Sequence, residues 1–461
     1  MEQITVGDIL KATGGRLLGG NPDQELRHIS IDSRVMRGED LFVPLIGERV
    51  DGHRFLAQAA AAGAAAALTS EHNSMPEQFQ SALIRVEDTK TALQDIGRYL
   101  RSRISIPLVG VTGSVGKTTT REMVAAALSA RYRTFKTPAN HNSQIGVPLT
   151  LSEISKEDEI GVLELGMSEP GEMAVIAGIA AVDTAVMTNI GVTHIENLGT
   201  RENILKEKLH IQDGMREGGV LFVNGDNDLL SRVKAKNGCQ TIRYGLGADC
   251  QYRAEEVEIR DGFPSFTMVH GAVRIPVTLS VMGEHNISNG LAALAVADYY
   301  GVPLEAAARS LGAFTGFENR QQLYRSGGRM ILDDTYNASP DSVRAAIRVL
   351  ASLEGKRRIA VLADMKELGL DGPVFHREVG EYLAGEAVDV LITFGPLAAS
   401  MAQGAQEKAE RTGRSIQVRS FGEEERDEMH AFLKDFLQEG DAVLFKGSNS
   451  MHLGETVKQF L

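Results

Sequence analysis

The sequence predicts an α/β protein of several domains, and three observations support this prediction. The chain has 461 residues, which is enough for about three domains that each bury their own core. A glycine-rich loop at 110–120 stands between an apolar run and a segment of helical periodicity. In the last third of the chain, apolar strands alternate with helices, which is typical of an open, mostly parallel, doubly wound sheet.

The composition is that of an acidic globular protein. Hydrophobic residues make up 43% and charged residues 24% of the chain, as in soluble globular proteins. The formal net charge of −13 argues against nucleic acid or an anionic membrane as the main partner. Cys239 and Cys250 are too few for a disulfide framework and lack the spacing of a zinc site. The N-terminus has no signal sequence and no apolar run has spanning length, so we expect a cytoplasmic protein without a membrane segment. We also expect it to be a monomer.

The first domain is predicted over residues 1–103 as a small α/β unit. Periodicity and turn signals indicate a helix at 6–13, a strand at 40–45, an alanine-rich helix at 55–62 and a buried strand at 64–69. Ser33 and Arg34 follow an apolar pair and could offer a hydroxyl and a guanidinium to a phosphate. By themselves, these two residues fit a surface turn with a solvated arginine better.

A phosphate-binding loop is the main feature of the second domain, predicted over 104–312. The apolar run 106–111 indicates a strand, and helical periodicity follows at 121–131. Between them, Gly113 and Gly116 turn the chain so that backbone N–H groups and a helix N-terminus point at one place, which suits a polyphosphate. The next two residues, Lys117 and Thr118, add a positive charge and a hydroxyl for Mg²⁺. A plain strand-to-helix turn is the alternative, and Gly-Lys-Thr in this context disfavours it.

Two further strands of this domain end next to residues suited to a ligand site. The strand at 160–164 closes with Glu164, where P-loop enzymes place an acid that holds Mg²⁺, although a solvated glutamate fits about as well. The strand at 184–189 leads to His194, at the end of the sheet where α/β proteins place ligands. Because Mg²⁺ prefers oxygen ligands, His194 by itself indicates a capped turn rather than a metal ligand.

Two later helices of the second domain carry polar clusters. The helix predicted at 203–215 bears Lys206, Lys208 and His210, and its composition indicates a solvated face. A second cluster, formed by His285, Asn286 and Asn289, stands at the start of a helix predicted at 290–300. Amides there could read a base or a ribose, or could simply cap the helix. Between these helices, residues 257–281 indicate β-hairpins without evident chemistry.

The third domain is predicted over 313–461. Its expected strands lie at 330–333, 358–362, 389–394, 416–421 and 442–445, with helices between them. No Gly-x-Gly-x-x-Gly follows its first strand, so a nicotinamide cofactor is not indicated. Polar loops at 333–340, 364–369 and 446–449 all follow strands. They should therefore gather at one edge of the sheet and form a ligand cleft.

Six motifs together resemble those of the Mur ligases, the ATP-dependent amide-forming enzymes of peptidoglycan precursor synthesis. They are Thr112-Gly-Ser-Val-Gly-Lys-Thr118, Glu164-Leu-Gly, Thr188-Asn-Ile-Gly-Val-Thr-His194, Gly283-Glu-His-Asn286, Asp334-Thr-Tyr-Asn-Ala-Ser-Pro340 and Lys446-Gly-Ser448. Their order and rough spacing match the family across all three segments. The resemblance implies a small α/β N-terminal domain, a central P-loop ATPase-like domain and a C-terminal Rossmann-like domain without the dinucleotide fingerprint.

Within the family, the chain is similar to the member that adds D-alanyl-D-alanine to UDP-N-acetylmuramoyl-tripeptide. The motifs concerned are Asp32-Ser-Arg34 with Asp51-Gly-His53, Glu164-Leu-Gly-Met with Gly171-Glu172, and Tyr336-Asn-Ala-Ser-Pro340. The sibling that adds the third residue of the peptide typically carries the motif Asp-Asn-Pro-Arg in its last domain, and this chain does not contain that motif. The implied partners are these two substrates, with ATP and Mg²⁺ as cofactors. A P-loop kinase and a nucleotide-binding regulator without turnover are the alternatives from other classes.

The resemblance also implies roles for individual residues. Around ATP it implies Gly113, Ser114, Gly116, Lys117, Thr118, Thr119, His285, Asn286, Asn289, Arg320 and Asp334. Around Mg²⁺ it implies Thr118, Glu164, His194 and a carbamylated Lys208, with Lys117, His194 and Lys208 as the catalytic residues. Ser33 and Arg34 would contact the UDP-sugar, and Tyr336, Asn337, Lys446 and Ser448 the peptides. Three residues depart from the family pattern: His210 replaces glutamate, Ser339 replaces asparagine and Asn449 replaces arginine.

Overall fold

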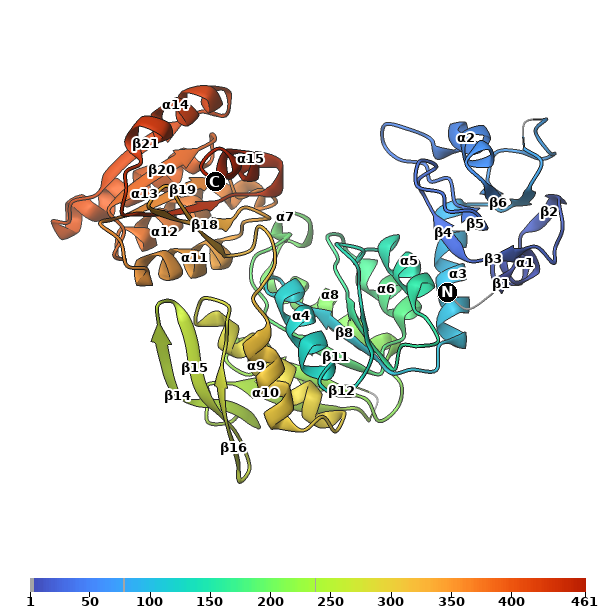
Figure 1. Cartoon of the computed structure of the whole chain (residues 1–461), viewed down its shortest axis with the longest axis horizontal. Helices are drawn as coiled ribbons and strands as arrows, with labels where there is room; N and C mark the ends of the chain where they lie inside the picture. The colour runs from blue at the N-terminus through green and yellow to red at the C-terminus, as the bar shows by residue number, and fades with distance from the viewer. Residues whose placement is uncertain (1–3, 78, 237) are drawn as a thin grey trace.

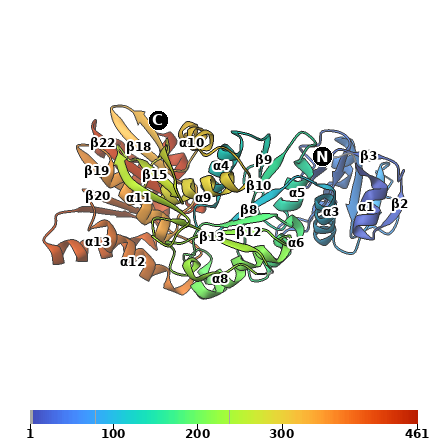
Figure 2. The same cartoon turned by 90° about the horizontal axis from the view of Figure 1, so that it is seen from below.

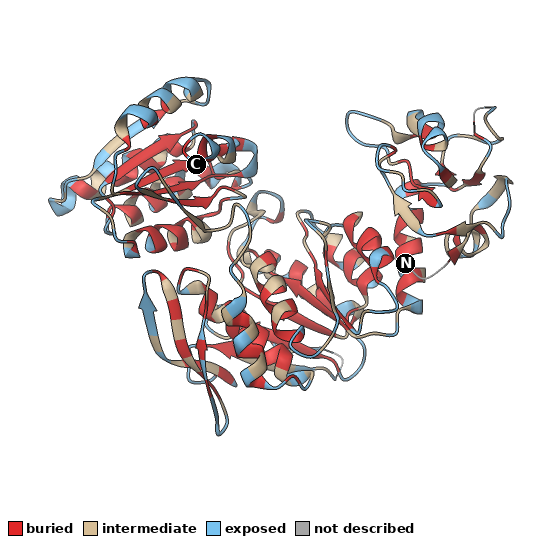
Figure 3. Ribbon diagram, viewed as in Figure 1, coloured by how far each residue is buried: buried red, intermediate tan, exposed pale blue. Residues whose placement is uncertain are grey.

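The computed structural model describes residues 4–77, 79–236 and 238–461, which form three α/β domains. Figures 1 and 2 show the central domain between the other two, with the chain termini in the two outer domains. In the central and C-terminal domains, the strands of the sheets consist mostly of buried residues, as Figure 3 shows. Among the described residues, no helix is both long enough and apolar enough to cross a bilayer.

The N-terminal domain contains a five-stranded sheet in the order β2-β7-β6-β5-β4. The strands are β2 (Arg16–Gly19), β4 (His28–Ser30), β5 (Asp40–Phe42), β6 (Ala64–Thr69) and β7 (Ala82–Arg85), and β1 (Ile4–Thr5) pairs with β3 (Glu25–Leu26). Its helices are α1 (Val6–Thr13), the short η1 (Gly52–Phe55), α2 (Leu56–Ala61) and α3 (Thr89–Arg103). The buried side chain of Arg101 on α3 donates to the carbonyl of Ala180 and pairs with Asp183, which attaches α3 to the central domain.

The central domain is built on a nine-stranded sheet in the order β16-β15-β14-β13-β12-β11-β8-β10-β9. Its strands are β8 (Leu108–Thr112), β9 (Thr134–Lys136), β10 (Ile160–Glu164), β11 (Thr184–Met187), β12 (Val220–Asn224), β13 (Gln240–Gly245), β14 (Tyr252–Arg260), β15 (Phe263–His270) and β16 (Val273–Thr278). Pairing is parallel from β9 to β14 and antiparallel in the β14-β15-β16 hairpins. The parallel part leaves the C-terminal ends of its strands at one edge, where ligands of such sheets bind.

Helices cover both faces of the central sheet. The helices and one-turn segments are α4 (Lys117–Leu128), α5 (Gly146–Glu153), α6 (Glu172–Ala180), α7 (Ile195–Leu198), α8 (Arg201–Lys208), η2 (Leu209–Gly214), η3 (Leu230–Arg232), α9 (His285–Tyr299) and α10 (Leu304–Ala313). One core cluster joins the sheet to α4, α9 and α10, and the other joins it to α5, α6 and α8. Burial on both faces explains the unbroken apolar runs of these strands.

The C-terminal domain has a six-stranded sheet in the order β17-β18-β22-β19-β20-β21, in which only β17 is antiparallel. The strands are β17 (Gln322–Ser326), β18 (Arg329–Asp334), β19 (Arg357–Ala363), β20 (Val390–Phe394), β21 (Gln417–Phe421) and β22 (Asp441–Lys446). Its helices are α11 (Pro340–Ser352), η4 (Gly369–Asp371), α12 (Gly372–Leu383), α13 (Ala398–Thr412), η5 (Glu423–Glu425), α14 (Arg426–Phe436), η6 (Asn449–Met451) and α15 (Leu453–Lys458). Core clusters on both faces confirm the doubly wound prediction.

Several sequence predictions differ from the structure in their bounds. The helix predicted at 290–300 begins earlier, as α9, so that the polar cluster at 285–289 lies within it. The helix predicted at 203–215 is α8 followed by η2. The strand predicted at 40–45 is shorter, since β5 ends at Phe42. The edge strand β17 was not predicted, because its partly buried residues lack the continuous apolar run of a fully buried strand.

Candidate active site

The phosphate loop at 113–116 connects β8 to α4 and has room only for glycine at its first position. A Cβ on Gly113 would lie 1.9 Å from Oγ1 of Thr188, which is closer than any stable contact. At the other end, Gly116 has φ of +82° and precedes α4 without a side-chain cap. Because no side chain occupies them, the first N–H groups of α4 are available to an anion.

A second loop, which follows β11, holds the phosphate loop in place. The N–H of Ser114 donates to the carbonyl of Asn189 at 2.9 Å, and the N–H of Val115 donates to its Oδ1 at 2.8 Å. In return, the N–H of Gly191 donates to Oγ of Ser114 at 3.0 Å. Lys117 folds back over the loop and donates from Nζ to the carbonyl of Gly113 at 2.9 Å. The loop is therefore rigidly supported before any ligand binds.

Glu164, at the end of β10, is buried and held by two partners. The amide of Asn142 donates to its Oε1 at 2.8 Å, and Nη1 of the Arg121 guanidinium lies 3.3 Å from its Oε2. Arg121 is itself buried, on α4 one turn after Lys117. The carboxylate is thus fixed beside the phosphate loop rather than solvated, which answers the alternative that the sequence left open.

Lys208 is fully buried, and its amine has no hydrogen-bond partner among the described residues. The prediction of a solvated face on this helix was therefore wrong for Lys208, although Lys206 is exposed. Desolvation, with a smaller contribution from the positive charge of Lys117, holds the pKa of Lys208 well below its usual value. Both effects favour the neutral form of the amine, which is the form that acts as a nucleophile.

Lys117 and His194 both face groups from the C-terminal domain. Desolvation lowers the pKa of Lys117, and the negative charges of Glu164 and Glu367 oppose that shift. Nδ1 of His194 lies 2.7 Å from a carboxylate oxygen of Glu367. His194 has φ of +63° and begins α7 without a side-chain cap, so the capped-turn reading does not describe it. Its ring instead bridges two domains.

The amide cluster of α9 joins this helix to the phosphate loop. Oδ1 of Asn289 accepts from the hydroxyl of Thr120 at 2.9 Å, and its Nδ2 donates to Oδ1 of Asn286 at 2.8 Å. A Cβ on Gly116 would stand 3.3 Å from Oδ1 of Asn289. The neighbouring His285 faces charges of the C-terminal domain, and burial lowers its pKa to about 4. The cluster thus lies directly over the loop.

The three polar loops of the C-terminal domain gather at one sheet edge, as predicted. Nζ of Lys446 lies 2.7 Å from a carboxylate oxygen of Asp334 and donates to the carbonyl of Asn337 at 2.9 Å. The loop at 364–369 is joined to the loop at 446–449 by the N–H of Lys366, which donates to the hydroxyl of Ser448 at 2.9 Å. Lys446 and Ser448 are buried, so both hold the loops together in this arrangement.

The linker into the C-terminal domain carries Arg320 between two strained residues. Asn319 and Gln321 have φ of +60° and +51°, which is uncommon for residues other than glycine. The Arg320 guanidinium stacks 4.0 Å from the ring centroid of Tyr336, a cation–π contact. This stack brings a predicted nucleotide residue and a predicted peptide residue together.

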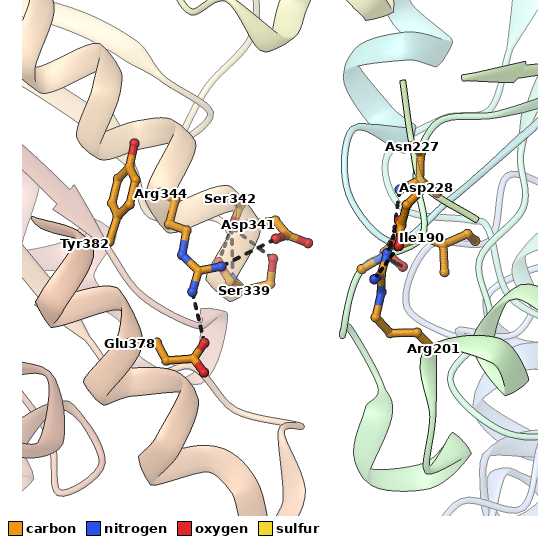
Figure 4. Close-up of polar contacts among 12 residues, drawn as sticks. Ile190, Arg201, Asn227, Asp228, Ser339, Asp341, Ser342, Arg344, Glu378 and Tyr382 are labelled. Carbon is orange, nitrogen blue, oxygen red and sulfur yellow. Dashed lines mark hydrogen bonds and ion pairs between the residues drawn. The ribbon is translucent and has the colours of Figure 1, made fainter. Parts of the chain in front are cut away.

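Two charged clusters face each other across the boundary between the central and C-terminal domains (Figure 4). On the central side, Arg201 pairs with Asp228 at 2.6 Å, and on the other side Arg344 lies 3.1 Å from Glu378. Asp341 projects from the first turn of α11, and a Cβ on Gly191 would lie 2.2 Å from its carboxylate. Burial raises the pKa of Asp341, with Arg344 and Arg201 opposing the shift.

The N-terminal candidates differ from one another in exposure. Ser33 is buried, whereas the Arg34 side chain is mostly exposed and pairs with Asp32 at 2.6 Å. Both residues follow β4, in the domain at the opposite end of the molecule from the C-terminal domain (Figure 1). Ser33 and Arg34 therefore belong to a different domain from the phosphate loop.

The residues that depart from the family pattern have clear structural positions. Ser339 is the N-cap residue of α11, and its N–H donates to Oγ of Ser342 at 2.9 Å. The amide of Asn449 donates to the carbonyl of Tyr336 at 3.3 Å. His210 pairs with Asp213 in the same segment, η2, and is half-buried.

Sequence reasoning did not identify Arg121, Asn142, Asp341 or Glu367 as residues of this site. Asn142 lies in the stretch 138–148, which is dense in amide side chains. Such a stretch fits ligand contact and turn capping equally well. Glu367 lies in one of the three predicted polar loops, but its partner is in another domain. Nothing in the sequence pairs residues that are so far apart along the chain.

Three known family domains match successive parts of the chain: the Mur ligase family catalytic domain at 25–101, the Mur ligase middle domain at 111–297 and the Mur ligase glutamate ligase domain at 319–449. The UDP-N-acetylmuramoyl-tripeptide–D-alanyl-D-alanine ligase of Bacillus subtilis is 38% identical over 466 residues, covering 100% of this chain and 99% of that protein. A crystal structure of MurF from Acinetobacter baumannii superposes with a TM-score of 0.90 at 30% identity, covering 100% of this chain and 99% of the other. MurF ligase from Thermotoga maritima in complex with ADP superposes with a TM-score of 0.82 at 29% identity, covering 94% and 97%. From these matches along its whole length, the chain belongs to the Mur ligase family.

Proposed function

We propose that this protein is an ATP-dependent ligase that joins D-alanyl-D-alanine to the carboxylate of UDP-N-acetylmuramoyl-tripeptide and releases ADP and phosphate. The observation that carries the proposal is the rigid phosphate loop at 113–116, in a chain that matches the Bacillus ligase over its full length. The Thermotoga protein, which was solved in complex with ADP, supports nucleotide binding by this chain. The domains are proposed as 1–103 for the UDP-sugar, 104–312 for ATP and 313–461 for the incoming dipeptide.

The reaction needs activation, because a carboxylate would have to expel oxide to react with an amine. Transfer of the γ-phosphoryl group of ATP to the tripeptide carboxylate gives an acyl phosphate and ADP. The neutral dipeptide amine then attacks the acyl carbon, a tetrahedral intermediate forms, and phosphate leaves as the amide bond is made. Lys117 and the free N–H groups of α4 would stabilise the charge on the transferring phosphoryl group.

The donor groups beside the loop fit Mg²⁺. Thr118 and Glu164 are buried oxygen donors, which this ion prefers. Thr118, Glu164, His194 and a carbamylated Lys208 would hold the ion, which would neutralise negative charge on the phosphates. The buried amine of Lys208, which has no hydrogen-bond partner among the described residues and a lowered pKa, supports carbamylation, since only a neutral amine adds to CO₂ and the product carries carboxylate oxygens.

The remaining roles are proposed by residue. The nucleotide site would comprise Gly113, Ser114, Gly116, Lys117, Thr118, Thr119, His285, Asn286, Asn289, Arg320 and Asp334. Ser33 and Arg34 would contact the UDP-sugar, and Tyr336, Asn337, Lys446 and Ser448 the peptides. Lys446 and Ser448 would have to exchange their present loop contacts to reach a peptide. Because the nucleotide would lie on the central domain and the dipeptide on the C-terminal domain, we propose that domain closure assembles the site. Equal small-angle scattering with and without nucleotide plus tripeptide would contradict this.

The decisive experiment measures phosphate release from ATP with each substrate alone and with both together. Release that requires both the UDP-tripeptide and the dipeptide, with a product of the summed peptide mass, is the expected result. A phosphorylated product without amide formation would indicate a kinase, and no release at all a nucleotide-binding regulator. Repeating the assay with other amines separates the proposed reaction from those of sibling ligases.

A further inference from the structure

The contact between His194 and Glu367 joins the central domain to the C-terminal domain at the phosphate site. Nδ1 of His194 lies 2.7 Å from the Glu367 carboxylate, and the histidine ring is mostly buried while the carboxylate is half exposed. The same two segments also pack together, since α7 contacts η4 and a Cβ on Gly369 would lie 3.3 Å from Cα of Glu196. Glu367 is therefore an active-site neighbour that comes from outside the nucleotide-binding domain.

The loop that carries Glu367 is anchored residue by residue. The carboxylate of Asp364 accepts from the N–H of Ala398 at 2.8 Å, and the N–H of Met365 donates to Nε2 of the buried His376 at 2.9 Å. The N–H of Lys366 donates to Ser448. Three consecutive residues before Glu367 are thus fixed to three different elements of the C-terminal domain.

Both partners also have unusual backbone conformations. Glu367 has φ of +65° and His194 has φ of +63°, in the left-handed region that side chains other than glycine disfavour. Such strain persists where the surrounding structure enforces it, and it is common at functional sites. Here it places Nδ1 of His194 2.7 Å from the Glu367 carboxylate, as an ion pair in which Nδ1 forms no hydrogen bond.

A carboxylate on one ring nitrogen determines what the other nitrogen can do. When Nδ1–H donates to a carboxylate, Nε2 keeps its lone pair and the ring is fixed in orientation. The 2.7 Å contact forms no hydrogen bond in the present geometry, so this role requires the half-exposed Glu367 carboxylate to turn toward Nδ1–H. Histidines that bind metals almost always direct their second nitrogen at a carboxylate, a carbonyl or water. The alternative is a plain ion pair between the domains, which would not require the proton of the His194 ring to be on one particular nitrogen.

We propose that Glu367 is a positioning residue that fixes the ring of His194, with Nε2 toward the divalent cation of the phosphate site. This inference rests on the proposed function for the identity of the cation. Because Glu367 belongs to the C-terminal domain, the metal site is complete only while that domain contacts α7. The arrangement makes cation binding depend on the position of the domain that brings the dipeptide.

The test measures Mn²⁺ binding by electron paramagnetic resonance with ADP present, in the full-length protein. The variants are Glu367→Ala, Glu367→Gln, His194→Ala and the matched control Asp371→Asn, an exposed carboxylate four residues farther along the same loop. We expect Glu367→Ala to weaken Mn²⁺ binding by about 10- to 100-fold, with a smaller loss in Glu367→Gln, whose amide oxygen still accepts. Asp371→Asn should bind as the wild type does.

A second readout concerns the histidine itself. Nitrogen-15 histidine spectra, with the His194 signals assigned from His194→Ala, should show a proton on Nδ1 in the wild type and a mixture of tautomers in Glu367→Ala. Unchanged Mn²⁺ affinity and an unchanged tautomer in Glu367→Ala would overturn the proposal. Unchanged affinity in His194→Ala would also overturn it. Absence of dipeptide-dependent phosphate release would instead count against the proposed function, because neither readout depends on turnover.

Discussion

Lys446 and Asp334 form a buried ion pair of 2.7 Å that ties the end of β22 to the end of β18. Both side chains are almost inaccessible to water. A buried pair of this kind contributes little against an apolar replacement, but either charge left alone is costly because it loses both water and partner. The pair therefore fixes the edge of the sheet where the three polar loops meet.

Replacing one member of this pair should destabilise the C-terminal domain strongly. Lys446→Met leaves the Asp334 carboxylate buried without its cation, at a cost of about 3–5 kcal/mol. Thermal unfolding should show the loss, and the double variant Lys446→Met/Asp334→Asn should recover most of it. Additive losses in the double variant would mean that the two side chains act independently.

Gly113→Ala should abolish nucleotide binding. The new Cβ would overlap Oγ1 of Thr188, which lies 1.9 Å from its position, so the loop must move away from the place where it cradles phosphate. Isothermal titration with ADP measures the effect. The control is Gly178→Ala, because that position lies inside α6 with no atom near its Cβ. Alanine there should leave binding unchanged and raise stability by about 0.4–1 kcal/mol.

Lys117→Ala should abolish turnover while leaving UDP-tripeptide binding nearly intact. The side chain supplies the positive charge closest to the loop, and it contacts loop carbonyls rather than the N-terminal domain. Phosphate release measures turnover, and titration with the UDP-tripeptide measures binding. Retention of the full rate would exclude the role assigned to this lysine.

The turnover rate should depend on bicarbonate, through Lys208. If its neutral, buried amine adds CO₂, removing bicarbonate at pH 7 should lower the turnover rate and adding it back should restore the rate. Carbon-13-labelled bicarbonate should give a carbamate signal in the wild type that Lys208→Ala lacks. Lys206→Ala is the matched control on the same helix, since that side chain is exposed. A carbamate signal that survives Lys208→Ala would assign the modification elsewhere.

The sequence was most informative where structure is local. The bounds predicted at 6–13, 64–69 and 160–164 coincide with α1, β6 and β10, because apolar runs and turn residues set them within a few positions. The phosphate loop is equally local, since its glycines and its lysine are adjacent in the chain. Its supporting contacts to Asn189 and Asn289 are not local, and they depend on which strands become neighbours in the sheet.

Burial was the property that composition predicted least well. Lys208 looked solvated because its neighbours in sequence are charged, yet it is fully buried while Lys206 is exposed. The helical repeat separates two residues at this spacing onto different faces. Only the packing of α8 against α6 and the sheet decides which face is inside.

The stability of the protein should fall in mild acid through His285. Its pKa is about 4 in the folded state, against an ordinary value of 6.5, because burial disfavours the charged ring. Between these values the unfolded chain binds a proton that the folded chain does not, so unfolding becomes easier as the pH falls from 6.5 toward 4. The slope is at most about 1.4 kcal/mol per pH unit for one group. Thermal unfolding of wild type and His285→Gln at pH 7 and pH 5 tests this: the variant should lose less stability between the two values. His28→Gln, in the N-terminal domain, should keep the wild-type difference, and an equal difference in His285→Gln would assign the acid sensitivity to other groups.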